Sequence, residues 1–319
     1  MLEVSNLKTW FPVRKRLFGS IQHVKAVDGV SFTLKPGEVL AVIGESGSGK
    51  TTLGRTVLRL VKPTSGKIIF DGRDVTNLTE SRLKWYRFST AMIFQDPFGS
   101  LNPYHTAQYI LEEPLILRDV PPSERLERVI KALEEVRLTP PEDFLKKYPH
   151  MLSGGQRQRV GIARALITRP RFVVADEPVT MLDVSIRAEI LSLIRSLQSK
   201  FNIAMMYITH DIATAKYLAD KVLVMYAGKM VEYGPFRDVV KEPLHPYTQA
   251  LIEALPDPDP ANRFKMRKVP TGEPPSLINP PSGCRFHPRC PYFIKGRCDK
   301  EEPQLVEARR GHHVACWLY

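Results

Sequence analysis

Residues 44–51 have the composition and spacing of a phosphate-binding loop. They read Gly-Glu-Ser-Gly-Ser-Gly-Lys-Thr and fit the pattern Gly-x-x-x-x-Gly-Lys-Ser/Thr. In such a loop, glycines turn backbone N–H groups toward phosphate oxygens, Lys50 reaches the outer phosphates and Thr51 binds Mg²⁺. An apolar run precedes the loop and a helical pattern follows it, as the motif requires. The predicted nucleotide ligands of this segment are Gly44, Glu45, Ser46, Gly47, Ser48, Gly49, Lys50, Thr51 and Thr52.

Two carboxylates end a second apolar run, at residues 172–177. Asp176 has the chemistry of a partner for Mg²⁺ beside a phosphate loop. Glu177 is one position further, where a general base could take a proton from an attacking water. Alone, such a pair is more often a turn or a helix cap. Together with the loop at 44–51, it favours nucleotide hydrolysis.

The run Leu-Ser-Gly-Gly-Gln at 152–156 lies between these two elements. By itself a Ser-Gly-Gly stretch is a flexible turn. Its place after the phosphate loop and before the acidic strand makes it a candidate for the other half of an ATP site.

Strands and helices must alternate to position these motifs. Apolar runs predict strands at 39–43, 172–176, 203–208 and 222–226, with helices at 51–61, 157–169, 185–200 and near 211–219. This alternation is typical of a parallel sheet. Strands are also expected at 27–34 and 67–70, and residues 104–150 have the apolar spacing of a helical insert.

Composition places the chain among ordinary globular proteins. It has 319 residues, 43% of them hydrophobic and 25% charged, with a net charge of +12. Disordered and fibrous classes are therefore excluded. The basic residues are spread along the chain, with one tight cluster at 14–16, and a solvated or membrane-facing surface explains them better than nucleic-acid binding. No apolar run approaches the roughly 20 residues of a membrane span, and no signal peptide is evident, so a cytosolic chain is expected.

These motifs in this order resemble the nucleotide-binding subunits of ABC transporters, over residues 4 to about 235. The resemblance implies a P-loop α/β fold with a RecA-like core, an antiparallel β subdomain and a helical subdomain at about 96–165. It identifies Gln95 as a residue that senses Mg²⁺ and water, His210 as the switch histidine, and Phe11, rather than Trp10, as the aromatic on adenine. It further implies that each ATP also contacts the partner's signature and Asp-containing loop, here Ser153, Gly154, Gly155, Gln156 and Asp183. One departure is Met181, where the family usually has alanine; it could change packing at the dimer interface.

Three further segments resemble the di-/oligopeptide importer branch of the family. They are residues 94–103, residues 245–251 and the cysteine-containing tail. The resemblance implies a peripheral ATPase on the cytoplasmic side of the membrane. Its expected partners are a related but non-identical ATPase, two membrane subunits and an external binding protein. Relatives also import short oligosaccharides, so the cargo stays open between peptide and oligosaccharide.

The composition changes after about residue 235. Thirteen of the 27 prolines lie between 243 and 303, and all four cysteines follow residue 283. We therefore predict a nucleotide-binding domain at 1–235 and a small proline- and cysteine-rich module at 236–319, stapled by a ligand rather than continuing the sheet.

Four cysteines in one short segment of a cytosolic chain are unlike a disulfide framework. Four thiolates suit Zn²⁺ or an iron–sulfur cluster, and a module with no metal is a third reading. The branch resemblance implies a four-iron four-sulfur cluster, with zinc as the weaker alternative. The expected ligands are Cys284, Cys290, Cys298 and Cys316.

Two other classes compete with a transport ATPase. Soluble relatives act on ribosomes or DNA, but they usually carry two ATPase units or a long coiled coil, and neither is evident here. A non-catalytic regulatory subunit conflicts with the presence of Glu177 and His210.

Overall fold

The computed structural model describes residues 1–14, 21–254 and 272–319. One unit comprises Met1–Leu34, Val39–Asn77 and Ile208–Tyr319, and the other comprises Lys35–Glu38 and Leu78–Tyr207. The expected basic cluster at 14–16 lies mostly outside the described residues, as does the stretch 255–271 of the C-terminal module.

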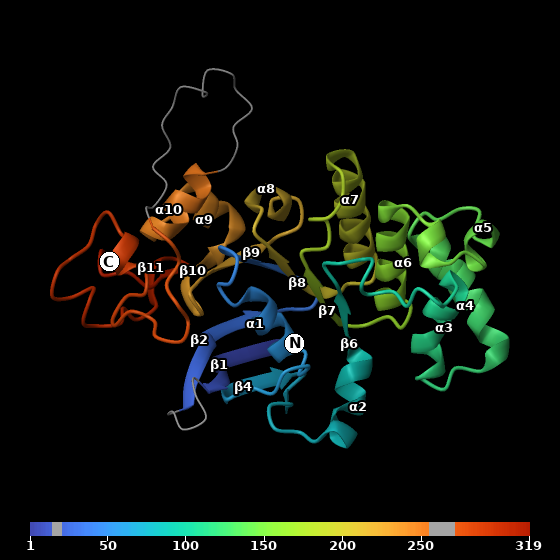
Figure 1. Cartoon of the computed structure of the whole chain (residues 1–319), viewed down its shortest axis with the longest axis horizontal. Helices are drawn as coiled ribbons and strands as arrows, with labels where there is room; N and C mark the ends of the chain where they lie inside the picture. Colours follow the sequence, from blue (N-terminus) through green and yellow to red (C-terminus); the bar gives the residue numbers. More distant parts are fainter. Residues whose placement is uncertain (15–20, 255–271) are drawn as a thin grey trace, which may run out of the picture. The chain divides into compact units, whose positions relative to one another are not determined.

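An antiparallel sheet forms one part of the first unit. Its order is β2-β1-β4-β5, and β1, β2 and β4 lie side by side in Figure 1. The apolar side chains of one face are buried, including Leu2, Val4 and Leu7 of β1. This sheet confirms the expected antiparallel part of the fold. The strands are β1 Leu2–Arg14, β2 Ile21–Leu34, β4 Ser65–Phe70 and β5 Arg73–Asp74.

A second sheet in this unit carries the phosphate loop. β3 Val39–Ile43 is buried along its whole length and pairs in parallel with β9 Lys221–Tyr226. Such a strand reads as a continuous apolar run because both faces are covered. β10 Lys229–Pro235 then pairs antiparallel with β9. The helices of the unit are α1 Lys50–Val57, α8 Ile212–Ala215, α9 Phe236–Lys241 and α10 Pro246–Glu253.

The C-terminal module continues this sheet, contrary to the expectation from its proline content. β12 His312–Val314 pairs antiparallel with β10, and β11 Val306–Arg309 pairs with β12. A short 3₁₀ turn covers His287–Arg289. The prolines lie mainly in the connections, whereas the last residues of the chain supply the N–H and C=O groups that a strand needs.

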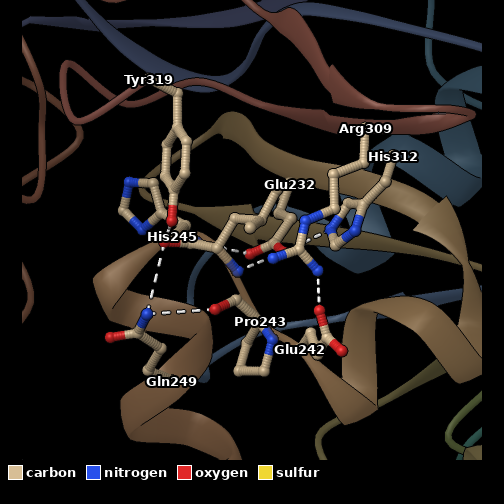
Figure 2. Close-up of polar contacts among 9 residues, drawn as sticks. Glu232, Glu242, Pro243, His245, Gln249, Arg309, His312 and Tyr319 are labelled. Atoms are coloured by element: carbon tan, nitrogen blue, oxygen red, sulfur yellow. Dashed lines mark hydrogen bonds and ion pairs between the residues drawn. The ribbon is translucent and has the colours of Figure 1, made fainter.

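A buried carboxylate holds the module against β10, as Figure 2 shows. Glu232 is fully buried, and its oxygens accept the backbone N–H groups of Leu244 and His245. His312 Nε2 lies 2.7 Å from Glu232 Oε1. Near the surface, Arg309 pairs with Glu242. One carboxylate thus joins β10, the start of α10 and β12.

The second unit contains the acidic strand and its neighbours. β6 Thr90–Ile93 and β7 Phe172–Asp176 are parallel, with Ile93 opposite Ala175. β8 Ala204–Thr209 follows α7 Val184–Lys200, and α2 Glu80–Ser89 precedes β6. The strand order is β8-β7-β6, and the parallel pairing of β6 with β7 is the arrangement expected.

The expected helical insert forms a bundle of helices (Figure 1). α4 shows why: Val129, Ala132 and Leu133 are buried on one face, and charged residues cover the other. Its members, with the turn before the last helix, are α3 Ala107–Ile116, α4 Pro122–Glu135, α5 Glu142–Leu145, the 3₁₀ turn Pro149–Met151 and α6 Gly154–Leu166.

Several helices and strands begin or end at residues other than those predicted. The strand expected at 27–34 begins at Ile21, and the helix expected at 51–61 ends at Val57. The helix expected near 211–219 is only one turn long, Ile212–Ala215, and the carboxylate of Asp211 caps its N-terminus. Within the described part of the chain, no helix is long and apolar enough to cross a bilayer.

Candidate nucleotide-binding site

The phosphate loop connects the buried strand β3 to helix α1. Gly44 and Gly49 have φ angles of 153° and 103°. A Cβ at Gly44 would lie 2.1 Å from Met225 O, and one at Gly49 would lie 2.0 Å from Ala26 O. Only glycine fits where backbones approach this closely. The motif therefore has its predicted strand–loop–helix context, and the loop opens at a helix N-terminus that favours anions.

Lys50 lies within the loop that it ends. Its side chain is almost fully buried, and Nζ donates to Gly44 O and Glu45 O at 2.8 Å each. The hydroxyl oxygen of Ser48 is also buried, and it has no hydrogen-bond partner among the described residues. A buried ammonium beside a buried hydroxyl is the chemistry that a phosphate group can satisfy.

Two other predicted residues of the same unit are exposed. His210 follows β8 directly and lies at the surface. Phe11 on β1 is 39% exposed. The neighbouring Trp10 ring lies under the Lys25 ammonium, 5.0 Å from the centroid, and its Nε1 donates to Asp28. Because these contacts engage Trp10, Phe11 stays the better prediction for an adenine-stacking ring.

In the second unit, parallel pairing brings two predicted catalytic residues together. Gln95 follows β6 and Glu177 follows β7. Gln95 Nε2 donates to Glu177 Oε2 at 3.3 Å, and Thr180 Oγ1 donates to the same oxygen at 3.1 Å. Glu177 has a φ of 44°, a rare conformation for a residue that is not glycine. Asp176, the last residue of β7, is buried.

The signature run begins helix α6 with a capping box. Ser153 N–H donates to Gln156 Oε1 at 3.0 Å, and Gln156 N–H donates to Ser153 Oγ at 3.3 Å. This reciprocal pair satisfies two of the free N–H groups at the helix start. A Cβ on Gly155 would lie 2.9 Å from Ile186 Cγ2 of α7, so the glycine permits close packing of the two helices.

The loop between the acidic strand and α7 is braced by one arginine. Arg187 Nε donates to Leu182 O at 2.8 Å, and its NH2 group donates to Thr180 O at 3.3 Å. Asp183 is the last residue before α7. Met181 is 55% exposed, so its larger side chain does not alter the interior of the unit.

The four cysteines line a single cavity in the C-terminal module, together with Phe286 and His245. All four are free thiols. Burial raises the pKa of the Cys284 thiol to about 11, and charge on the other three cysteines also raises it. Burial likewise raises the pKa values of Cys290 and Cys316. Among the described residues, no three His, Cys, Asp or Glu side chains are close enough to hold a single metal ion.

Three residues that were not predicted as site residues contact the phosphate loop or the buried Asp28. Arg289 pairs with Glu45 of the phosphate loop, and the Tyr247 hydroxyl accepts the Glu45 N–H. Arg285 pairs with the buried Asp28. The sequence does place an arginine next to a cysteine twice, at 284–285 and at 289–290. Their partners could not be predicted, because each lies more than 240 residues away in the sequence.

Comparison with known proteins decides the family. A family model described as ABC transporter matches residues 27–180, and one described as the C-terminal region of oligopeptide/dipeptide transporters matches residues 231–298. The oligopeptide transport ATP-binding protein AppF of Bacillus subtilis is 47% identical over 100% of this chain and 97% of its own length. The chain belongs to the ABC transporter ATP-binding family.

Other matches agree with this ABC ATPase assignment. A putative peptide import ATP-binding protein of Brucella ovis is 49% identical over 92% of each chain. Among solved structures, the ATP-binding cassette MJ0796, a dimer bound to ADP and phosphate, has a TM-score of 0.66 and 29% identity. The match covers 74% of this chain and 99% of that one. The fold is therefore that of an ABC ATPase cassette, as predicted, with a C-terminal extension.

Proposed function

We propose that this ABC ATPase hydrolyses ATP to drive the import of oligopeptides across the cell membrane. The observation that carries the proposal is the match to the C-terminal region of oligopeptide/dipeptide transporters at residues 231–298. That region lies outside the general ABC match, so it distinguishes this branch from other ATPases of the family. The printed names of the relatives from Bacillus subtilis and Brucella ovis point to the same class of cargo.

The residues divide the proposed reaction between binding and proton transfer. The loop at 44–52 binds the phosphates, with Lys50 on the outer phosphates and Thr51 as a ligand of Mg²⁺. Asp176 and Gln95 are proposed as further ligands of Mg²⁺, because this ion prefers oxygen ligands. Glu177 accepts the proton of the attacking water, and the contact with Gln95 at 3.3 Å supports that role by orienting its carboxylate. His210 contacts the γ-phosphate, and Phe11 stacks on adenine.

A second ATPase subunit completes each site in this proposal. Ser153, Gly154, Gly155, Gln156 and Asp183 contact the ATP held by the partner, and the partner's signature contacts the ATP held by Lys50. Support comes from the exposure of Ser153 at the start of α6, where N–H groups and a hydroxyl favour anions. We propose that the partner is a related but non-identical chain, and that both work beneath two membrane subunits on the cytoplasmic side, supplied by an external binding protein.

We propose that the four cysteines bind a four-iron four-sulfur cluster. They are free thiols around one cavity, and thiolate is the usual ligand of such clusters. When bound, the cluster would supply four metal–thiolate bonds that tie the ends of the module together. Cys284, Cys290, Cys298 and Cys316 would hold it.

The transport proposal is tested by reconstituting the complete transporter in lipid vesicles. We expect binding protein loaded with oligopeptides to stimulate ATP hydrolysis, and Lys50→Ala in this chain to reduce the stimulated rate. Stimulation by short oligosaccharides alone would contradict the peptide class. Stimulation of the free chain by ribosomes or DNA would instead favour a soluble ATPase.

The cluster proposal is tested on the full chain purified without oxygen. We expect about four iron and four acid-labile sulfide per chain and a broad visible absorption, both lost when Cys298 is changed to serine. A colourless protein with one zinc, or with no metal, would refute the proposal.

A further inference from the structure

The C-terminal module, which carries the four cysteines, contacts the phosphate loop directly. Arg289, which adjoins Cys290, forms a two-pronged ion pair with Glu45: NH1 lies 3.0 Å from Oε2 and NH2 lies 3.3 Å from Oε1. Its side chain is 8% exposed and that of Glu45 is 28% exposed. A shielded, two-pronged arginine–carboxylate pair fixes direction as well as distance.

The same loop residue is held at its backbone. Glu45 N–H donates to the Tyr247 hydroxyl at 2.8 Å, and Glu45 O accepts from Lys50 Nζ at 2.8 Å. Tyr247 is buried, and its ring lies 4.6 Å from that of Tyr226. The Tyr226 hydroxyl in turn accepts from Arg289 NH1 at 3.2 Å. Glu45 is therefore held at its N–H, its C=O and its carboxylate.

A second connection starts at the other end of the same short segment. Arg285, which adjoins Cys284, is buried and bonds to Ala227 O and to Asp28. Gly228, which follows Ala227, donates its N–H to Ser48 O in the phosphate loop at 2.9 Å. The segment 284–290 thus reaches the loop from both of its cysteine ends.

We propose that segment 284–290 positions the phosphate loop, with Arg289 and Tyr247 together fixing Glu45. The affinity for MgATP then depends on whether residues 284–290 keep the conformation described here. Arg289 is a positioning residue in this scheme because it acts through Glu45 of the loop rather than on a reacting atom. The inference rests on the proposed function, since it concerns the same nucleotide site. It gives the module a regulatory connection to ATP binding.

The test measures binding of a fluorescent ATP analogue, with Mg²⁺, to the full chain by anisotropy. Arg289→Met keeps an unbranched, mostly apolar stem and removes both prongs, so we expect the Kd to rise about fivefold or more, in the range of ordinary coupling between sites. Arg289→Lys should give an intermediate value. The control is Arg297→Met in the same module, whose guanidinium lies 4.2 Å from the Trp317 ring and which should change the Kd less than about twofold.

Two double-mutant cycles separate positioning from general damage. Glu45→Gln with Arg289→Met should weaken binding no more than the stronger single change, because both remove one interaction. Cys290→Ser should weaken binding in the parent chain but add little in the Arg289→Met background. In the assembled transporter, Arg289→Met should raise the KM for ATP and leave kcat nearly unchanged.

An unchanged Kd for Arg289→Met, in a chain with a parent-like thermal transition, would overturn the proposal. If that variant does not fold, Tyr247→Phe provides the same test, since it removes only the hydroxyl that accepts the Glu45 N–H. If the parent chain itself fails to bind the MgATP analogue, the proposed function fails, and that result is distinct from loss of the positioning role.

Discussion

Gln95 and Thr180 both donate to the carboxylate of Glu177. Glu177→Gln keeps the size of the side chain and removes its basicity. We expect ATP to remain bound in the assembled complex and turnover to fall about 100-fold or more, the usual contribution of a general base. Glu189→Gln, on the surface of α7 beside Arg159, is the matched control. Near-normal hydrolysis by Glu177→Gln would refute its assignment as the base.

Asp28 tests the energetic value of a buried ion pair. Burial tends to raise the pKa of this carboxyl, but the Lys229 and Arg285 cations outweigh that effect and lower it below its usual value. Its stabilisation is therefore fully present above the unfolded pKa of about 4 and is lost as the pH falls below it. Asp28→Asn leaves Arg285 buried without its counter-charge, and we expect about 3 kcal/mol less stability at pH 7.

The measurement is urea unfolding at pH 7 and again below pH 4. The difference between parent and Asp28→Asn should shrink at the lower pH. Glu242→Gln is the control, because its pair with Arg309 is about half exposed on both sides and should be worth less than about 1 kcal/mol. Equal losses from both changes would contradict the distinction between buried and exposed pairs.

At the scale of elements, two glycines of α6 should respond in opposite directions to alanine. A Cβ at Gly161 meets nothing within 4 Å, whereas one at Gly155 would lie 2.9 Å from Ile186 Cγ2. Gly161→Ala should stabilise the unit by about 0.5–1 kcal/mol through helix propensity. Gly155→Ala should cost about 1 kcal/mol or more because α7 must shift. Urea midpoints measure both, and a stabilising Gly155→Ala would show that the helices can separate freely.

Elements that are buried on both faces could be predicted from the sequence. β3 and β7 read as continuous apolar runs because helices or loops cover them on both sides, and their polar ends mark the motifs. β12 could not be found this way. Three residues are too few for an alternating pattern, and its place beside β10 depends on His312 reaching the buried Glu232. The pairing of Arg289 with Glu45 likewise depends on tertiary structure, since nothing local to either residue indicates the other.

At the scale of the whole molecule, the isolated chain should be a weak ATPase. The proposed site on Lys50 lacks the donors that a partner's signature supplies, and loss of one such donor costs a factor of about 100 to 1,000 in rate. We expect turnover to rise about tenfold or more when the partner ATPase and membrane subunits are added. Ser153→Ala should then slow the site on the partner rather than the site on Lys50, which is measured with the other site inactivated. Full activity of the chain alone, independent of its concentration, would contradict the shared site.

The pairing of β12 with β10 also bears on solubility. β10 contains Met230 and Val231, and without the final residues its backbone groups would form an open edge that another chain could join. In the full chain the edge is instead β11, a four-residue strand with the charged Glu307 and Arg309, which is a poor template for pairing. A chain ended at Leu305 is therefore expected to aggregate, visible as concentration-dependent light scattering. The last fourteen residues thus protect the sheet against self-association.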